Sequence, residues 1–228
     1  SFNTYEGWAL HGDTWKGIDI VASLEYLTTN GQKGIVREDA QTQYDKLFKT
    51  HASLAPGPVN VEGDNIDARL DVKKGYGQAR LGYQGRRNLG TGTNMTQTLD
   101  PKGYRTGDRI NADLTYHNPD FAPHWDVTAQ LSYLDIKALY SENLYPPGAF
   151  GGRYPDGYII HIGAPDRHVR LETFAFYSGF QKHLFRLGAG YHDADQYQVT
   201  DIQNYGTNPA TGLPIPPGAP LVDLSNTP

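Results

Sequence analysis

The chain has 228 residues, 38% of them hydrophobic, no cysteine and a formal net charge of −5. The acidic balance argues against a nucleic-acid partner, which needs a basic face, and the lack of cysteine excludes a disulfide framework and a thiolate metal site. No run of about 18 apolar residues occurs, so the sequence contains no transmembrane helix. The mean hydropathy of −0.59 is typical of a soluble protein, but a barrel strand, apolar only at alternate positions, looks equally hydrophilic.

Apolar and polar residues alternate along much of the chain, and this period of two predicts β-strands. The pattern recurs as ASLEY (22–26), ARLGY (79–83), ADLTY (112–116) and AQLSY (129–133), and more loosely as TFAFY (173–177) and LGAGY (187–191). In chain order, we expect eight strands at 2–11, 18–27, 65–73, 77–86, 108–117, 125–139, 167–179 and 184–199.

The connections between these strands alternate between short and long. The short ones span 12–17, 73–76, 118–124 and 180–183. The long ones span 28–64, 87–107, 140–166 and the residues from 200 onward, and they are rich in Gly, Pro, Asn and Asp. Short turns at one end and long loops at the other are typical of a transmembrane barrel, whose short turns face the periplasm. The predicted fold class is therefore all-β, an antiparallel meander forming part of a transmembrane β-barrel.

Each strand has one apolar and one polar face. In RINADLTYH (109–117) the apolar side chains Ile110, Ala112 and Leu114 alternate with Asn111, Asp113 and Thr115. We expect one outer surface to carry Ile66, Ala68, Leu70, Ala79, Leu81, Ile110, Ala112, Leu114, Ala129 and Leu131. The opposite, lumenal surface is expected to carry Asp19, Glu25, Asp67, Arg69, Asp71, Lys73, Arg80, Asp113, Arg170 and Glu172.

Tyrosines near the strand ends predict two aromatic bands that flank the apolar belt. Tyr26, Tyr83 and Tyr191 are expected toward the long-loop end. Tyr116 and Tyr177 are expected toward the short-turn end, near Trp15, Phe121 and Trp125. Rings of this kind sit at a boundary between water and an apolar phase.

Five segments, in order along the chain, resemble the barrels of TonB-dependent outer-membrane receptors. They are EGWALHGDTWKGIDIVASLEYLTTNGQ (6–32), ASLAPGPVNVEGDNIDARLDV (52–72), GYQGRRNLGTG (82–92), NADLTYHNPDFAPHWDVTAQLSY (111–133) and RLGAGYHDADQYQV (186–199). The resemblance implies a plugged barrel in the outer membrane of a Gram-negative bacterium. Such a barrel imports a scarce solute, for example a ferric siderophore, using energy from an inner-membrane complex.

The sequence departs from this family in having no plug domain, no energy-coupling box and eight predicted strands where such transporters have 22. We therefore expect residues 1–228 to be the N-terminal part of such a barrel. The partners implied are the energy-coupling complex, reached through the absent plug, a small-molecule ligand such as a metal chelate, and the lipid bilayer.

The best ligand-binding candidate is the segment YSENLYPPGAFGGRYPDGY (140–158). Aromatic rings beside a guanidinium suit an aromatic, anionic solute such as a ferric catecholate. In the alternative interpretation the rings pack the loop on itself or on neighbouring loops. The candidate residues are Tyr140, Tyr145, Phe150, Arg153, Tyr154 and Tyr158.

No other motif predicts chemistry. GTGTN (90–94) lies in a long loop with no following helix, which favours a flexible loop over a phosphate site. His192, Asp193 and Asp195 would suit a hard cation or simply a solvated strand end, and the eight histidines have no metal-ligand spacing. The sequence thus predicts a transporter with no catalytic residues, no metal site and no cofactor.

Two other functions fit the same pattern. One is a complete eight-stranded outer-membrane barrel with an adhesive or structural role. The other is a soluble all-β binding module, in which the apolar faces of two sheets would be buried against each other.

Overall fold

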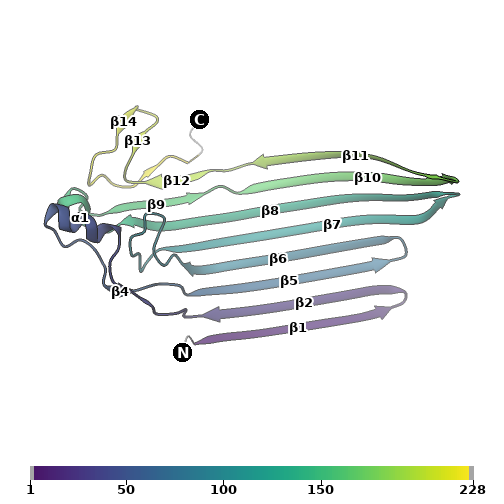
Figure 1. Cartoon of the computed structure of the whole chain (residues 1–228), viewed down its shortest axis with the longest axis horizontal. Helices are drawn as coiled ribbons and strands as arrows, with labels where there is room; N and C mark the ends of the chain where they lie inside the picture. Colours follow the sequence, from purple (N-terminus) through teal and green to yellow (C-terminus); the bar gives the residue numbers. More distant parts are fainter. Residues whose placement is uncertain (1–2, 226–228) are drawn as a thin grey trace.

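Eight long strands form one antiparallel sheet in the computed structural model, which describes residues 3–225 (Figure 1). Each long strand pairs with the next long strand along the chain, so the sheet is a meander and the all-β prediction is confirmed. The long strands are β1 (Thr4–Trp15), β2 (Ile18–Thr29), β5 (Gly63–Lys74), β6 (Gly77–Gly90), β7 (Tyr104–Ala122), β8 (Trp125–Tyr145), β10 (Asp166–Phe180) and β11 (His183–Gln196).

Tight turns join the strands at one end of the sheet, which we call the turn end, and the long connections gather at the other, the connection end (Figure 1). The predicted hairpins β5–β6, β7–β8 and β10–β11 are all present. The β1–β2 turn has only two central residues, Lys16 and Gly17, with φ of 51° and 75°. Two positive φ values fit a type I′ turn, whose twist matches that of the strands.

The strands are longer than the sequence predicted. The first strand continues to Trp15 instead of ending at residue 11, because its ladder with β2 runs right up to the turn. The sixth continues to Tyr145 instead of 139, because its far end pairs with β7 on one edge and with β9 (Tyr158–Gly163) on the other. The last ends earlier, at Gln196, and the predicted start at residue 2 lies outside the described residues.

The long connections are folded, where the sequence predicted only loops. The first contains β3 (Ile35–Val36), α1 (Ala40–Phe48) and β4 (Gly57–Pro58). The third contains the four-residue segment α2 (Ala149–Gly152) and β9, which extends the sheet at the connection end. The last contains β12 (Thr200–Gln203), β13 (Thr207–Asn208), β14 (Leu213–Pro214) and β15 (Val222–Asp223).

The sheet has one apolar and one charged face, as predicted. Residues directly opposite each other on neighbouring strands share a face. One such row defines what we call the apolar face: Ile20, Val72, Ala79, Leu114, Leu131, Leu171 and Tyr191. The row one residue along defines the charged face: Val21, Asp71, Arg80, Asp113, Ser132, Arg170 and His192.

Nothing among the described residues covers the apolar face. Leu114 is 60% exposed and Leu81 is 52% exposed. Of the predicted outer residues, Leu70, Leu81, Ile110, Leu114 and Leu131 are exposed, and Ile66, Ala68, Ala79, Ala112 and Ala129 are half-buried between their neighbours. The chain exposes 14484 Å², whereas a compact monomer of this mass exposes about 10,300 Å². The excess arises because the sheet is a single layer.

The small hydrophobic core lies under the long connections rather than against the sheet. Its members come from all of the long connections but the first, together with the end of β8. They are Leu99, Leu144, Ala149, Ile160, Ile215 and Leu224. The long connections thus fold as a cap over one end of an otherwise uncovered sheet.

Aromatic rings line the turn end of the sheet. The rings of Trp125 and Tyr177 are 4.8 Å apart, and those of Tyr76 and Tyr116 are 6.1 Å apart. Tyr26 lies in the half of β2 nearer the connection end, as predicted, whereas Tyr83, the seventh of the 14 residues of β6, lies at the middle of its strand. Tyr191, the ninth of the 14 residues of β11, lies in the half of its strand nearer the connection end, as predicted, directly opposite Leu171 of β10.

The sheet is not closed. Among the described residues, β1 pairs only with β2 and β11 pairs only with β10, so each carries an unpaired edge. The observed architecture is therefore an open, single-layered antiparallel sheet with a folded cap at its connection end (Figure 1).

Candidate functional site

An aromatic cluster lies in the cap. We use this name for Tyr44, Tyr145, Phe150, Tyr154, Tyr158 and Tyr205. The ring centroids of Tyr145 and Phe150 are 4.6 Å apart, those of Tyr154 and Tyr158 are 4.2 Å apart, and Tyr158 stacks on Tyr205 at 4.6 Å. The cluster joins α1, α2, the ends of β8 and β9, and the last connection, so one ring surface ties three connections together.

Four of the six predicted ligand residues belong to this cluster: Tyr145, Phe150, Tyr154 and Tyr158. Tyr140 lies apart from it, within β8, with the guanidinium of Arg105 4.9 Å from its ring centroid. The sequence missed Tyr44 and Tyr205, whose rings contact Phe150 and Tyr158. Each lies about 50 or more residues from its partner, and no local pattern connects residues so far apart.

Phe150 has an unusual backbone conformation at the centre of the cluster. Its φ and ψ are 55° and 47°, in the left-handed region, and Gly151 follows with φ 77°. A bulky residue rarely adopts this conformation, which costs roughly 1–2 kcal/mol. Ring contacts with Tyr44, Tyr145 and Tyr158 hold Phe150 in place. Strain of this kind is often found at ligand sites.

Three tyrosines of the cluster, Tyr145, Tyr158 and Tyr205, have a raised pKa. Burial raises the pKa of Tyr158 above its ordinary value, and the hydrogen bond with Tyr154 raises it further. Burial, followed by the influence of Tyr44, raises the pKa of Tyr145. Burial likewise raises the pKa of Tyr205. These three phenols therefore keep their protons at physiological pH, and the formal positive charge at the site comes from Arg153.

Arg153 is the exposed member of the predicted site. Its guanidinium lies 5.9 Å from the ring centroid of Tyr154, and within residues 3–225 it forms no ion pair with a carboxylate. A free guanidinium above an aromatic ring is suited to an anionic, planar ligand. The rings beneath it pack on one another, as the alternative interpretation predicted, so a ligand would meet the outer edge of the cluster.

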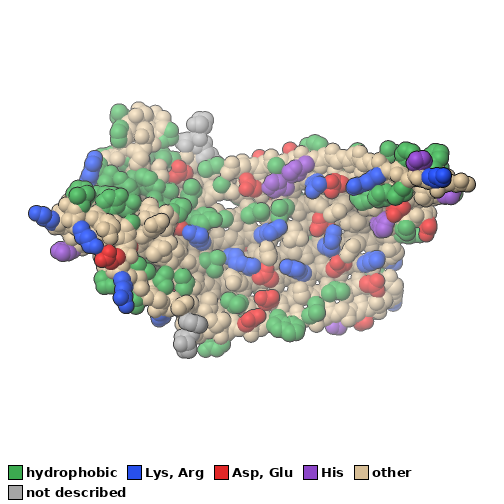
Figure 2. Space-filling model, in the orientation of Figure 1, with side chains coloured by type: hydrophobic (Ala, Val, Ile, Leu, Met, Phe, Trp, Pro, Cys, Tyr) green, Lys and Arg blue, Asp and Glu red, His purple; other side chains and the backbone are tan. Residues whose placement is uncertain are grey.

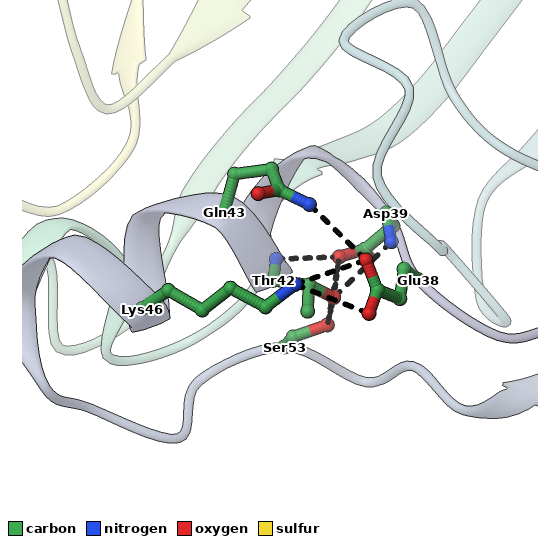
Figure 3. A network of polar contacts seen from close by, with 6 residues as sticks. All are labelled: Glu38, Asp39, Thr42, Gln43, Lys46 and Ser53. Carbon is green, nitrogen blue, oxygen red and sulfur yellow. Dashed lines mark hydrogen bonds and ion pairs between the residues drawn. The ribbon is translucent and has the colours of Figure 1, made fainter.

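A network of polar contacts fixes α1 beside the cluster (Figure 3). Asp39 caps the helix, accepting hydrogen bonds from the Thr42 amide at 2.8 Å and the Ser53 hydroxyl at 2.7 Å. Its other carboxylate oxygen accepts from the amide of Leu99 at 2.9 Å. One side chain thus joins the first long connection to the second. Glu38, its neighbour, forms an exposed ion pair with Lys46 and accepts a hydrogen bond from the side-chain amide of Gln43 at 3.2 Å.

Two buried carboxylates join the second connection to β8. Asp100 is 1% exposed and accepts from the amide of Asn143 at 2.7 Å. Glu142 is also 1% exposed and lies 3.2 Å from the guanidinium of Arg105. Buried charges of this kind require partners, and both have them. The cap is therefore a rigid platform for the aromatic cluster.

The charged face carries side chains of both signs across the middle of the sheet (Figure 2). All ten residues predicted for the lumenal surface share this face by register. Within this set, Arg170 and Glu172 form an ion pair at 2.5 Å. Asp71 and Asp113 instead accept from neutral donors, Gln78 for the former and Ser132 and Gln130 for the latter.

This arrangement leaves cations without carboxylate partners. Arg80 lies between Asp71 and Asp113 in register, yet neither Arg80 nor Arg109 forms an ion pair with another described residue. Both line a hollow of about 460 Å³ over Gly82. A Cβ at Gly82 would lie 2.5 Å from Asn111 Oδ1, so a side chain at this position would force the Asn111 amide to move. The lining of this hollow includes three arginines (Arg69, Arg80 and Arg109) and two aspartates (Asp71 and Asp113), a formal charge of +1 in an acidic chain.

Residues 3–225 contain no group of three or more His, Asp or Glu side chains placed to hold a metal ion. In the same part of the chain, no helix is long and apolar enough to cross a membrane. Comparisons with protein-family models, with curated proteins and with solved structures found no match.

Proposed function

We propose that the chain forms part of the wall of an outer-membrane transporter of the TonB-dependent type, which imports a scarce, anionic metal chelate such as a ferric siderophore. The observation that carries this proposal is the uncovered apolar face of a single-layered meander whose turns are short at one end only. A large apolar face that is left exposed to water tends to bind another apolar surface. The hydrocarbon core of a bilayer would cover the apolar face along the whole length of the strands.

Strand lengths support the proposal. A tilted strand needs about 9–11 residues to cross a bilayer, and each of the eight long strands has at least 12. β7 and β8 have 19 and 21 residues and would extend beyond the lipid. The aromatic rings at the turn end, including Trp125 and Tyr177, would lie at the periplasmic interface. The unpaired edges of β1 and β11 would pair with further strands of the barrel.

The cap supports a receptor role. It would face the outside of the cell, and it presents Arg153 above the ring of Tyr154 on a rigid platform. Arg80 and Arg109, on the charged face, would then line the lumen below. Both groups of cations favour an anionic solute.

The double variant Arg153→Ala/Tyr154→Ala tests the receptor role. We expect uptake of the ferric chelate by cells that produce the intact receptor to fall at least tenfold, because both the free guanidinium and the outermost ring are removed. The amount of receptor in the outer-membrane fraction should stay the same, because Arg153 is exposed and the ring contacts of Tyr154, with Phe150 and Tyr158, lie within the cap rather than on the apolar face. Uptake of a radiolabelled chelate and immunoblotting of membrane fractions measure both.

Arg37→Ala is the matched control. Arg37 is also an exposed arginine of a long connection, but it lies outside the aromatic cluster, so uptake should be unchanged. Unaltered uptake by the double variant would remove the receptor role from this segment. Recovery of the intact protein in the soluble fraction, without detergent, would overturn the membrane proposal itself.

A further inference from the structure

Two histidines on the charged face of the β10–β11 hairpin lie side by side (Figure 2). His168 Nδ1 and His192 Nε2 are 3.2 Å apart. The ring centroids are 5.4 Å apart with an interplanar angle of 14°. Because the centroids are farther apart than the two nitrogens, the rings approach edge to edge, each with a nitrogen directed at the other.

This separation matches the distance between two ligands of one metal ion. Zn–N bonds are about 2.0–2.1 Å long and meet at a tetrahedral angle, which places two ligand nitrogens about 3.3–3.4 Å apart. A small rotation of each ring would aim both lone pairs at a common point. His168 is half-buried and His192 exposed, so the surroundings allow such rotations.

The protonation chemistry is also compatible with a metal. In the hydrogen bond, one facing nitrogen carries the proton and the other accepts it. A change of tautomer moves that proton to the opposite ring nitrogen, and both facing nitrogens then offer lone pairs. Within residues 3–225, no hydrogen bond occupies His168 Nε2 or His192 Nδ1, so either atom is free to carry the proton.

The local charge does not prevent cation binding. Arg170 lies directly opposite His192, but its guanidinium donates to Glu172 Oε1 at 2.5 Å, which offsets its charge. Asp166 occupies the charged face two residues before His168. Imidazole nitrogens prefer Zn²⁺, Cu²⁺ and Ni²⁺ over the hard cations.

We propose that His168 and His192 form a two-histidine site for a divalent transition metal ion of the Zn²⁺ class. Water or an incoming solute completes the coordination, since the described residues provide no third ligand of this kind. The site is therefore open and exchangeable. The sequence did not predict it, because His192 was grouped with Asp193 and Asp195, whereas alternation puts His192 and Asp193 on opposite faces of β11.

Zinc titration of the full chain, purified in detergent without a polyhistidine tag, tests the proposal. The readout is competition with a chromophoric zinc indicator at pH 7.5. We expect one equivalent of Zn²⁺ to bind and Mg²⁺ not to compete. His168→Asn and His192→Asn should each weaken zinc binding at least tenfold, because one imidazole is a much poorer ligand than a chelating pair.

His117→Asn is the matched control. His117 also lies on the charged face, but its Nε2 is held 2.9 Å from Asp126, and its replacement should leave zinc binding unchanged. Binding that survives both His168→Asn and His192→Asn, or that is lost equally in His117→Asn, would overturn the site. Because the chain has no cysteine, no thiolate competes for the metal. Zinc binding by the histidine pair does not require the proposed transport function. The zinc-site proposal and the transport proposal can therefore fail independently of each other.

Discussion

In the proposed membrane-spanning barrel, Leu114→Arg is expected to lower the free energy of unfolding in lipid vesicles by about 2–4 kcal/mol. Leu114 lies near the middle of β7 on the apolar face and is 60% exposed. In water, a charge at so exposed a position would cost almost nothing. In a membrane it must leave water for hydrocarbon, and the cost is set by its depth. Reversible urea unfolding in vesicles, followed by tryptophan fluorescence, measures the change.

Thr115→Arg is the control for this substitution. Thr115 is the next residue of the same strand, lies on the charged face between Gln78 and Gln130, and its hydroxyl has no hydrogen-bond partner among the described residues. The same charge placed there should change the stability by less than about 1 kcal/mol. Equal losses for the two variants would contradict the assignment of the faces.

The second large effect is expected from Asp39→Ala. The substitution removes the cap of α1, worth about 1 kcal/mol, and leaves the buried amide of Leu99 without its acceptor, which costs about 1–3 kcal/mol. We therefore expect the opening free energy of the first and second long connections to fall by about 2–4 kcal/mol in total. Hydrogen exchange at Leu99 and across residues 30–62 reports this opening.

Glu38→Ala provides the comparison. Glu38 is adjacent in sequence and its side chain is 57% exposed in its ion pair with Lys46. Exposed pairs contribute about 0–1 kcal/mol, so exchange at Leu99 should hardly change. If Glu38→Ala loosened the cap as much as Asp39→Ala, the account of the polar network in Figure 3 would be wrong.

The effect of Asp39 should depend on pH. Burial alone would raise the pKa of Asp39, but the hydrogen bonds from Leu99, Ser53 and Thr42 outweigh it and lower the pKa below 3.8. The lowered value means that the folded state binds the proton less readily than the unfolded state. The stabilisation is thus complete above pH 3.8 and is lost as the pH falls through the folded pKa. The difference between wild type and Asp39→Ala should shrink over that range.

The sequence predicted the sheet well because alternation is a local signal. Along 109–117, the spacing of Ile110, Ala112 and Leu114 is enough to assign a strand and its faces. The cap was not predicted, because its elements are short and depend on distant partners. Helix α1 has only nine residues. The carboxylate of its N-cap residue, Asp39, accepts a hydrogen bond from the amide of Leu99, which lies 60 residues away in the sequence.

The candidate site was predicted in part for the same reason. The aromatic composition of the segment 140–158 predicted four members of the cluster, because these residues are close in sequence: Tyr145, Phe150, Tyr154 and Tyr158. Tyr44 and Tyr205 come from other connections and reach the cluster only through the fold. The histidine pair depends on the register of β10 with β11, which the sequence alone does not specify.

Spin labelling along β7 tests most directly whether the apolar face meets lipid. Single cysteines introduced at each of residues 110–115 of the proposed barrel can be spin-labelled, because this chain has no other cysteine and any cysteine outside it can first be replaced by serine. Collisions with oxygen, which concentrates in lipid, should be frequent at residues 110, 112 and 114. Collisions with a water-soluble nickel complex should be frequent at 111, 113 and 115. An unbroken alternation of the two is the predicted result, and labels that are inaccessible to oxygen at 110, 112 and 114 would contradict the membrane-spanning sheet.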